Sequence, residues 1–320
     1  NGSLIKQTGG GSGILIVNKG QDVISTFDGL TIENCIIRRC ERNGMIWSSY
    51  SSRNNWHPST NTVVRKNLIE EVPGDGIVPI GCEGALIEYN LMRNCPGTLP
   101  HSEAAAGFWP WSCDNTVLQF NEVSDHKAPW DAQGFDSDYN CHNTTIQYNF
   151  SHDNDGGMVL ICNSGTDGGV GNQGTVVQYN VSINDAIRPR ATRSGIFSAT
   201  IHIGGPCENT LINNNILHVN PKTASFIDRS IITSDSWDGY ANNTIFKENI
   251  FFAPQESEIR LTKSTNNIFD GNYYLGNFIG KPADKSAKDA SAYYYSCISK
   301  DPMGFDSLSF LFDMVIVGDG

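Results

Sequence analysis

The sequence is poor in charged residues and has no long apolar segment. Asp, Glu, Lys and Arg make up 18% of the 320 residues and leave a net charge of −12. This acidic balance disfavours nucleic acid and anionic lipid as partners, because both carry negative charge themselves. No apolar run reaches the length of about 18 residues that a membrane-spanning helix needs. We therefore predict no nucleic-acid partner and no membrane span.

Several common site motifs are missing as well. The Gly-rich residues 9–13 lack the Lys of a phosphate-binding loop, and no two His residues have the spacing of zinc ligands on one strand. The sequence also has no helical period of apolar residues and no Pro/Ser-rich linker. These absences disfavour a zinc site, a nucleotide site and a chain of several domains.

A short phrase is repeated nine times along the chain. It begins with Asn or a small residue, continues with Thr and two apolar residues, and ends in Asn at positions 34, 67, 90, 121, 149, 180, 215, 249 and 272. Successive spacings of 23 to 35 residues indicate a solenoid, and the β-branched, Gly-rich composition indicates strands. We predict an all-β parallel β-helix of about nine or more coils. Each repeated Asn would lie over the preceding one in a hydrogen-bonded ladder.

Four cysteines keep a fixed phase to this repeat. Cys82, Cys113, Cys141 and Cys207 each stand eight residues before a ladder Asn. This phase predicts an interior row of small buried side chains. The chain has nine cysteines, an odd number, so they do not form a complete set of internal disulfides. One or two bridges among the other cysteines remain an alternative.

The repeat covers residues 11–275 and defines the domain organisation. We predict a β-helix domain at residues 1–275 and a C-terminal cap at residues 276–320, since an open β-helix end exposes unpaired strand edges. The extra residues of the longer coils fall after the ladder strand and before the cysteine row. Long loops are thus expected on one side of the solenoid, which is commonly the binding side.

Aromatic residues are concentrated in these predicted loops. Trp109, Trp111 and Trp130 lie close together in the sequence, and all six Trp residues fall in the loop regions. Exposed rings beside carboxylates stack on sugar faces and bind hydroxyl groups, so the pattern favours a carbohydrate partner. The alternative is that the Trp side chains seal the core beneath the loops.

Acidic residues cluster between positions 125 and 155. Asp125 and Asp153 have the same phase, which predicts that they stack on neighbouring coils about 4.8 Å apart and that repulsion raises a pKa. Strand alternation at residues 133–138 would direct Phe135 inward and both Asp136 and Asp138 outward. Two outward carboxyl groups can act on one glycosidic bond, one as acid and one as nucleophile or base.

The segments 128–138 and 141–157 resemble secreted bacterial right-handed parallel β-helix proteins that act on carbohydrates. They are most similar to the lacto-N-biosidase-type glycoside hydrolases. The resemblance implies two catalytic aspartates in a groove, which correspond here to Asp131 and Asp138, with Asp136 as a third candidate. It also implies a secreted, periplasmic or cell-surface location.

The same resemblance and the local clustering suggest substrate-binding residues in this groove. The candidates are Trp109, Trp111, Trp130, His126, His152, Asp153 and Asp155. No cofactor is expected for a hydrolase of this kind. Because no long apolar stripe of the trimeric adhesin type is evident, we predict a monomer.

Two other functions remain open at this point. In a pectate-type lyase, Asp125, Asp153 and Asp155 would bind calcium, and one of Arg188, Arg190 and Arg193 would be the base. A non-catalytic β-helix of the tail-spike or adhesin type would bind glycans through the same aromatic rings. The acidic cluster favours the hydrolase, since a protein that only binds glycans does not need it.

Overall fold

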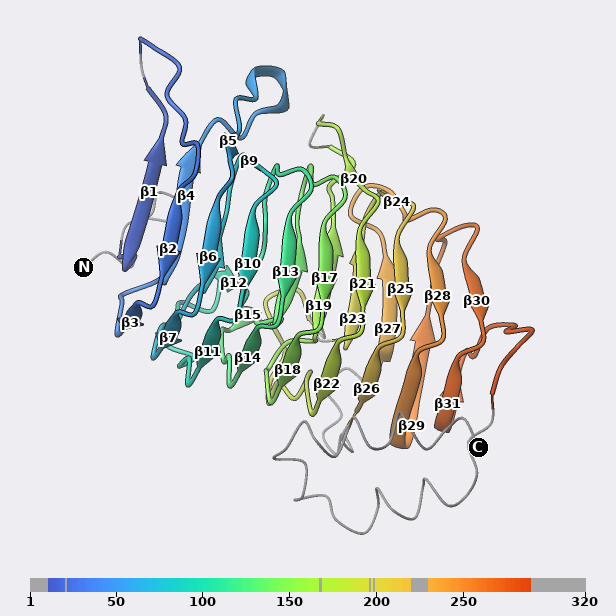
Figure 1. Cartoon of the computed structure of the whole chain (residues 1–320). Helices are drawn as coiled ribbons and strands as arrows, with labels where there is room; N and C mark the ends of the chain where they lie inside the picture. The colour runs from blue at the N-terminus through green and yellow to red at the C-terminus, as the bar shows by residue number, and fades with distance from the viewer. Residues whose placement is uncertain are drawn as a thin grey trace.

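The computed structural model describes residues 11–20, 22–166, 169–195, 197, 199–219 and 230–288. In these residues the chain winds into an elongated solenoid, and each strand pairs in parallel with the corresponding strand of the next coil (Figure 1). The predicted parallel β-helix is therefore confirmed. Residues 289–320 of the predicted C-terminal cap lie outside the described residues.

Each full coil contributes strands to three faces of the solenoid. The first face precedes the ladder Asn and consists of β2 (Thr31–Glu33), β6 (Val63–Arg65), β10 (Leu86–Glu88), β13 (Val117–Gln119), β17 (Thr145–Gln147), β21 (Val176–Gln178), β25 (Leu211–Asn213), β28 (Ile245–Lys247) and β30 (Ile268–Asp270). The second face follows the Asn and consists of β3 (Ile36–Arg38), β7 (Leu68–Glu70), β11 (Leu91–Arg93), β14 (Glu122–Ser124), β18 (Phe150–His152), β22 (Val181–Ile183), β26 (Ile216–His218), β29 (Ile250–Arg260) and β31 (Tyr273–Ile279).

The third face carries the candidate site. It consists of β1 (Ile14–Asn18), β4 (Met45–Ser49), β8 (Ile77–Val78), β16 (Phe135–Ser137), β19 (Val159–Cys162), β23 (Ile201–Gly204), β27 (Ser230–Asp235) and the end of β29, which joins the second and third faces. Short paired strands support the corners and loops: β5 (Ser59–Thr60) with β9 (Cys82–Glu83), β12 (Ala104–Ala105) with β15 (Trp130–Asp131), and β20 (Asn172–Gln173) with β24 (Cys207–Glu208). A 3-10 turn, η2 (Arg53–Asn55), lies in the loop after β4.

The Asn ladder runs along the corner between the first and second faces. Asn149 shows the pattern: its Nδ2 donates to Asn180 Oδ1 at 3.0 Å and to the Leu118 carbonyl at 2.9 Å, and its Oδ1 accepts from Asn121. The ladder contains Asn67, Asn90, Asn121, Asn149, Asn180, Asn215, Asn249 and Asn272. At its far end the Asp284 carboxylate accepts from Asn272, replacing a further Asn. Asn34 was also predicted in the ladder, but it is exposed, and the Cys35 amide instead donates to Asn67.

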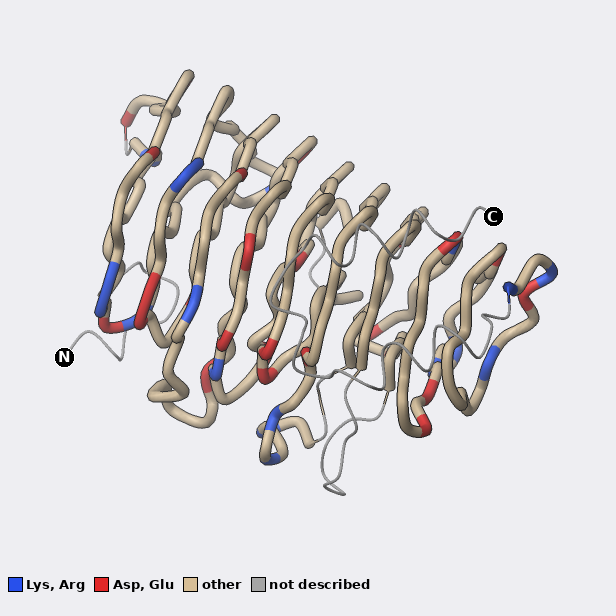
Figure 2. The backbone as a smooth tube through the Cα atoms, turned by 60° about the horizontal axis from the view of Figure 1, so that its bottom comes forward, with Lys and Arg blue, Asp and Glu red and all other residues tan. Residues whose placement is uncertain are grey.

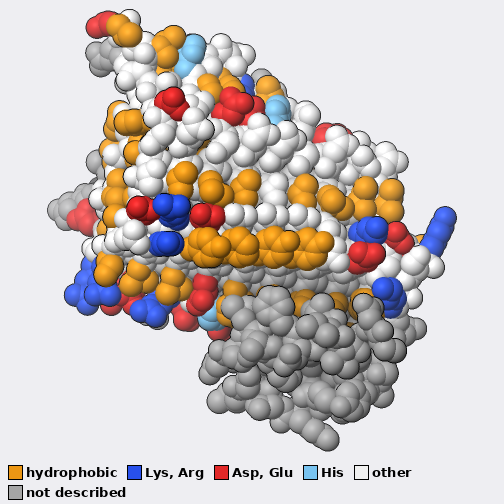
Figure 3. All heavy atoms as spheres, in the orientation of Figure 1, with side chains coloured by type: hydrophobic (Ala, Val, Ile, Leu, Met, Phe, Trp, Pro, Cys, Tyr) orange, Lys and Arg blue, Asp and Glu red, His pale blue; other side chains and the backbone are white. Residues whose placement is uncertain are grey.

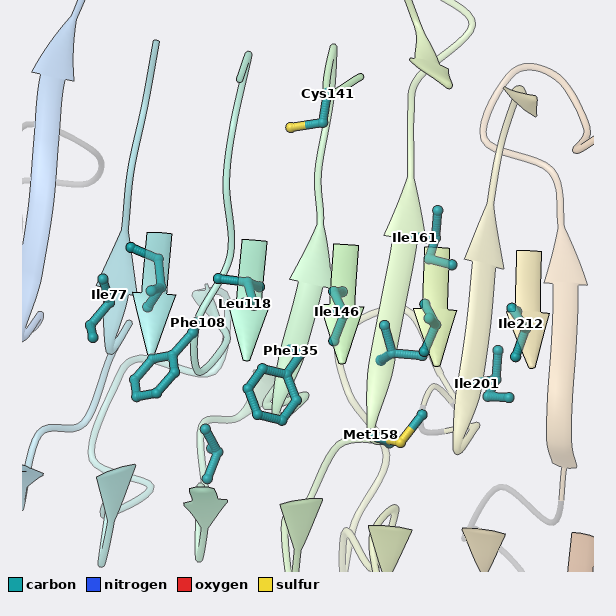
Figure 4. Close-up of a cluster of buried hydrophobic side chains, with 14 of the residues drawn as sticks. Ile77, Phe108, Leu118, Phe135, Cys141, Ile146, Met158, Ile161, Ile201 and Ile212 are labelled. Carbon is teal, nitrogen blue, oxygen red and sulfur yellow. The ribbon is translucent and has the colours of Figure 1, made fainter. Parts of the chain in front are cut away.

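The core is a continuous column of apolar side chains inside the coils (Figure 4). Met45, Ile77, Phe108, Phe135 and Val159 stack in register along the interior of the third face. The cysteine row is fully buried, as predicted, and every cysteine among the described residues is a free thiol. Burial of the row stabilises the coils without a covalent bridge in this part of the chain.

The longest connections flank the third face. Residues 94–103 and 184–200 lie before its strands, and residues 19–30, 50–58, 163–171 and 236–244 lie after them. The predicted domain boundary at residue 275 falls inside β31, so the β-helix continues beyond it. Lys and Arg residues are distributed along the solenoid among the more numerous acids (Figure 2). Within the described residues, no helix has the length and apolar character needed to cross a membrane.

Candidate active site

Strand register on the third face brings the predicted acids beside the predicted Trp residues. Phe108 pairs with Phe135, so the next outward positions, Trp109 and Asp136, are neighbours across two coils. The Asp138 amide bonds the Pro110 carbonyl at 3.2 Å, which sets Asp138 beside Trp111. Phe135 is buried in the core between these outward residues. The predicted alternation of inward Phe and outward Asp is therefore observed.

These side chains line a small cleft with a volume of about 120 Å³. Its lining residues are Arg42, Ile46, Asp75, Ile80, Ala104, Ala105, Ala106, Trp109, Trp111, Asp131, Asp136 and Asp138. The structure thus brings together all three predicted catalytic carboxyl groups and two of the three predicted Trp side chains. The cleft combines aromatic rings with closely spaced acids.

Asp131 reaches the cleft from a loop strand and not from the third face itself. It lies in β15, which pairs with β12 at Ala104 and Ala105. The backbone of Asp131 is left-handed, with φ of 61°, a conformation that Asp adopts more readily than most residues other than Gly. The Arg188 guanidinium fixes this loop by donating to the Asp131 carbonyl at 2.7 Å and to the Ala128 carbonyl at 2.6 Å.

The three carboxyl groups have different electrostatic environments. Burial, together with the nearby charge of Asp138, raises the pKa of Asp131 to about 7, although Arg188 opposes the shift. Burial and the charges of Asp138 and Asp131 also raise the pKa of Asp136 well above its usual range. Both groups are therefore able to hold a proton near neutral pH.

Asp138 has hydrogen-bond donors that favour its ionised form. Its Oδ1 accepts from the Tyr139 amide at 2.6 Å and from the Cys162 thiol at 3.2 Å. Donors to a carboxylate stabilise the charged state. The cleft thus contains one carboxyl group that accepts two hydrogen bonds beside two whose pKa is raised, and such different environments can separate a base or nucleophile from an acid.

The outer wall of the cleft is a buried ionic network that the sequence analysis did not identify. Arg42 bonds Asp75 at 2.5 Å and Glu103 at 3.2 Å. Asp75 Oδ1 accepts from Trp109 Nε1 at 3.0 Å and from the Ala106 amide at 3.0 Å. The network therefore fixes the Trp109 ring in the cleft. The available signal was that Arg42 and Asp75 each precede a third-face strand by two or three residues.

The other predicted substrate-binding residues lie outside this cleft. The Trp130 ring packs on Phe197 and on the Arg193 guanidinium. His126 is fully buried, with Nε2 3.0 Å from the Gly74 carbonyl, and burial lowers its pKa to about 4. His126 therefore supports the cleft wall at the residue before Asp75.

His152 and Asp153 form a pair at the end of the second face, with His152 Nδ1 2.8 Å from Asp153 Oδ2. This hydrogen bond lowers the pKa of Asp153. Burial disfavours charge on His152, but the bonds to Asp153 and Glu122 raise its pKa to about 9. Asp125 and Asp153 do lie on neighbouring coils, but the prediction that their repulsion raises a pKa is wrong for Asp153, because the His152 ring neutralises it.

The residues proposed for calcium in the lyase alternative do not form a calcium site. The Lys127 ammonium lies 3.8 Å from Asp125 and 3.5 Å from Asp155, where a cation would be needed. Among the described residues, one group of side chains has the spacing of metal ligands. It consists of Asp136, Asp138 and Cys162, whose potential ligand atoms lie within 4.8 Å of one another. Its buried thiol has a raised pKa, and calcium binds several oxygen ligands, so this donor set does not fit calcium either.

Fold and cleft together define a β-helix with a carboxylate-lined groove on one face. The sequence matches the family described as "Right handed beta helix region" over residues 12–230, and the chain belongs to this family. The handedness implied by the resemblance is thereby confirmed.

Individual relatives are carbohydrate enzymes. The chain is 27% identical over 300 residues to Lacto-N-biosidase of Bifidobacterium longum subsp. longum, a match that covers 84% of this chain and 17% of the relative. It therefore spans less than a fifth of that curated relative. The GH136 lacto-N-biosidase from Eubacterium ramulus has 20% identity and a TM-score of 0.49, with 80% of this chain and 36% of that chain covered. The match to the DFA-IIIase from Arthrobacter chlorophenolicus A6 has 11% identity and a TM-score of 0.55, and it covers 87% of this chain and 66% of that chain. The similarity to lacto-N-biosidase-type proteins is confirmed.

Proposed function

We propose that the protein is a glycoside hydrolase whose reaction takes place in the cleft of the third face. Asp131 is the general acid, and Asp138 is the nucleophile or the base. The observation that carries this proposal is the opposite electrostatic setting of the two groups. The pKa of Asp131 is raised to about 7, whereas Asp138 accepts two hydrogen bonds that favour its charge.

In this reaction Asp131 donates its proton to the glycosidic oxygen as the bond to the anomeric carbon breaks. Asp138 either attacks the anomeric carbon or removes a proton from the attacking water. Asp136 is buried beside Asp138, with a raised pKa, and in its neutral form can donate a hydrogen bond to a sugar oxygen. Trp109 and Trp111 provide apolar surface for a sugar ring.

The experiment is a comparison of wild-type, Asp131→Asn and Asp138→Asn proteins on a panel of aryl glycosides and oligosaccharides. The panel includes lacto-N-biosides because of the name of the curated relative. We expect either substitution to reduce kcat by at least a thousandfold with the fold retained. Addition of azide to an Asp138→Gly variant, in which the missing side chain leaves room for the anion, should restore aglycone release from an activated aryl glycoside if Asp138 is the nucleophile.

A chelator and an assay for unsaturated uronates distinguish the alternatives. Saturated products that persist with chelator support the hydrolase. Chelator-sensitive release of unsaturated sugars would replace it with a lyase, and glycan binding without any product would replace it with a non-catalytic binding protein. Full activity of Asp131→Asn on its substrate would refute the assignment of the acid.

A further inference from the structure

A stripe of stacked aromatic rings runs along the corner between the first and second faces, at the position just before each ladder Asn. We call Tyr89, Phe120, Tyr148 and Tyr179 the aromatic stripe. Their ring centroids are 5.0, 5.2 and 5.2 Å apart, and neighbouring rings are within 11° of parallel. Each ring is between 41% and 52% exposed. No long apolar stripe was evident in the sequence, but the structure contains one.

The stripe borders an apolar groove on the second face. Phe150, Val181, Ile216 and Ile250 occupy the outward position just after the ladder Asn on successive coils. Together with the aromatic stripe they line a hollow of about 530 Å³. Figure 3 shows a continuous hydrophobic band across this side of the molecule, with charged groups at both of its ends.

The N-terminal coils of the same face have a different surface. There the outward side chains form ion pairs, with Glu70 bonded to both Arg38 and Arg93 and Glu71 bonded to Arg39. We call these N-terminal coils of the second face its charged half, and the coils that carry the groove its apolar half, although Glu122 and Glu248 also line the groove. An apolar band of this extent on a soluble surface marks a contact site.

The ring geometry argues against a sugar as the occupant of the groove. Nearly parallel rings about 5 Å apart pack their faces against one another and expose their edges to solvent. Sugars stack on ring faces. A chain of apolar side chains, which packs on ring edges and between them, fits this surface better.

The course of the chain supplies such an occupant. The last described residue is Lys288, whose amide donates to the Asn272 carbonyl at 3.0 Å, so the chain arrives at the ladder corner beside the groove. A further 32 residues follow, and residues 305–317 read FDSLSFLFDMVIV, which is mostly apolar. The 16 intervening residues can span roughly 50 Å, whereas Tyr89, at the far end of the stripe, lies six coil steps, or ~29 Å, from Asn272.

We propose that residues 305–317 of this chain dock in the groove and against the aromatic stripe, covering the apolar half of the second face. Docking removes apolar surface of both partners from water and brings the C-terminal segment back over earlier coils of the solenoid. The proposal is independent of the function of the cleft.

The test is hydrogen–deuterium exchange of the full chain, followed by mass spectrometry. In the wild type we expect the amides of residues 305–317 to exchange at least tenfold more slowly than in the Val181→Lys/Ile216→Lys variant. The matched control is Leu68→Lys, which changes the same outward row in the charged half and should leave the exchange unchanged. Equal exchange of residues 305–317 in all three proteins would overturn the proposal.

A second variant keeps the proposal testable if the Lys substitutions disturb folding. Truncation after Lys288 should expose the groove and increase the binding of an apolar fluorescent dye severalfold, and unchanged dye fluorescence would contradict the docking. Light scattering identifies the competing occupant. If the wild type is a dimer and the protection of the groove is lost on dilution, a second copy covers the groove and the proposal is wrong.

Discussion

Substitution of Asp131 by Asn should abolish turnover and, at alkaline pH, stabilise the protein. A carboxyl group whose pKa is higher in the folded state than in the unfolded state opposes folding as soon as it must ionise. The folded pKa of Asp131 is about 7, against an ordinary value of 3.8. The loss of folding stability caused by ionisation of Asp131 is therefore absent below pH ~4, grows between pH ~4 and ~7, and is complete above pH ~7.

The size of the effect follows from the shift. A difference of about 3 pKa units at 1.36 kcal/mol each gives an upper bound of about 4 kcal/mol at pH 8. For a chain of this length that corresponds to an increase of roughly 6 °C in the unfolding midpoint. Thermal unfolding of wild type and Asp131→Asn at pH 4 and pH 8 measures the difference directly. The same pH dependence should appear in kcat/KM, which falls as Asp131 loses its proton above pH ~7.

The matched control is Asp125→Asn. Asp125 is 47% exposed and has only a 3.8 Å contact with Lys127. Its replacement should change stability by less than about 0.5 kcal/mol at either pH. If Asp131→Asn shifts the unfolding midpoint equally at pH 4 and pH 8, then the Asp131 carboxyl does not have a raised pKa, and the assignment of the general acid loses its basis.

Three further predictions concern the ladder, the cleft wall and the aromatic platform. Asn149→Ala should destabilise the protein by roughly 3–5 kcal/mol, measured by thermal or denaturant unfolding, because buried partners above and below lose their hydrogen bonds. Arg42→Met should cost about 3–5 kcal/mol, by the same measurement, because two buried carboxylates lose their cation. Trp111→Ala should raise KM about tenfold and change kcat less, in steady-state kinetics on the active glycoside, since the ring binds the sugar without reacting.

Each of these predictions has a comparison that would contradict it. Gln147→Ala alters a half-buried position on the first face. An equal loss of stability there would show that a ladder Asn contributes no more to stability than another polar residue of the same coil. Adding Glu103→Gln to Arg42→Met should recover part of the lost stability, because it removes one of the two buried carboxylates left without a cation. If stability does not recover, the loss in Arg42→Met is not caused by an uncompensated charge on Glu103. Trp130 lies outside the cleft, so an equal rise of KM in Trp130→Ala would show that the Trp111 effect is not local.

The repeat made most of the fold predictable. A period-two alternation of apolar residues specifies the strands and their inward side chains, and an Asn at constant phase specifies the corner that the Asn side chains bridge. Both could be predicted because every coil repeats the same strands and corner. Asn34 failed as a ladder member because it is one residue out of register: it stands opposite Lys66, and Cys35 holds the position opposite Asn67. Asp284 was missed as the ladder cap because it lies only 12 residues after Asn272, outside the repeat spacing.

The site was predictable only where it belongs to the repeat. Phe135, Asp136 and Asp138 follow the alternation of a third-face strand, so their directions could be derived from sequence. Asp131 entered through family resemblance, and its position depends on the pairing of two loop strands and on Arg188, 57 residues later. Local patterns contain no information on such distant contacts.

The sequence by itself thus determined the parallel β-helix, its buried cysteine row and the outward carboxyl groups of one coil, because these follow from periodicity along the chain. Only the tertiary structure decided which side chains share the cleft. It placed Trp130 and His126 outside it, added the Arg42 network, and separated the environments of Asp131 and Asp138. The physical reason is that burial and electrostatic neighbours depend on contacts between loops and coils, such as Arg188 with Asp131 and Cys162 with Asp138. These contacts set the pKa of a carboxyl group.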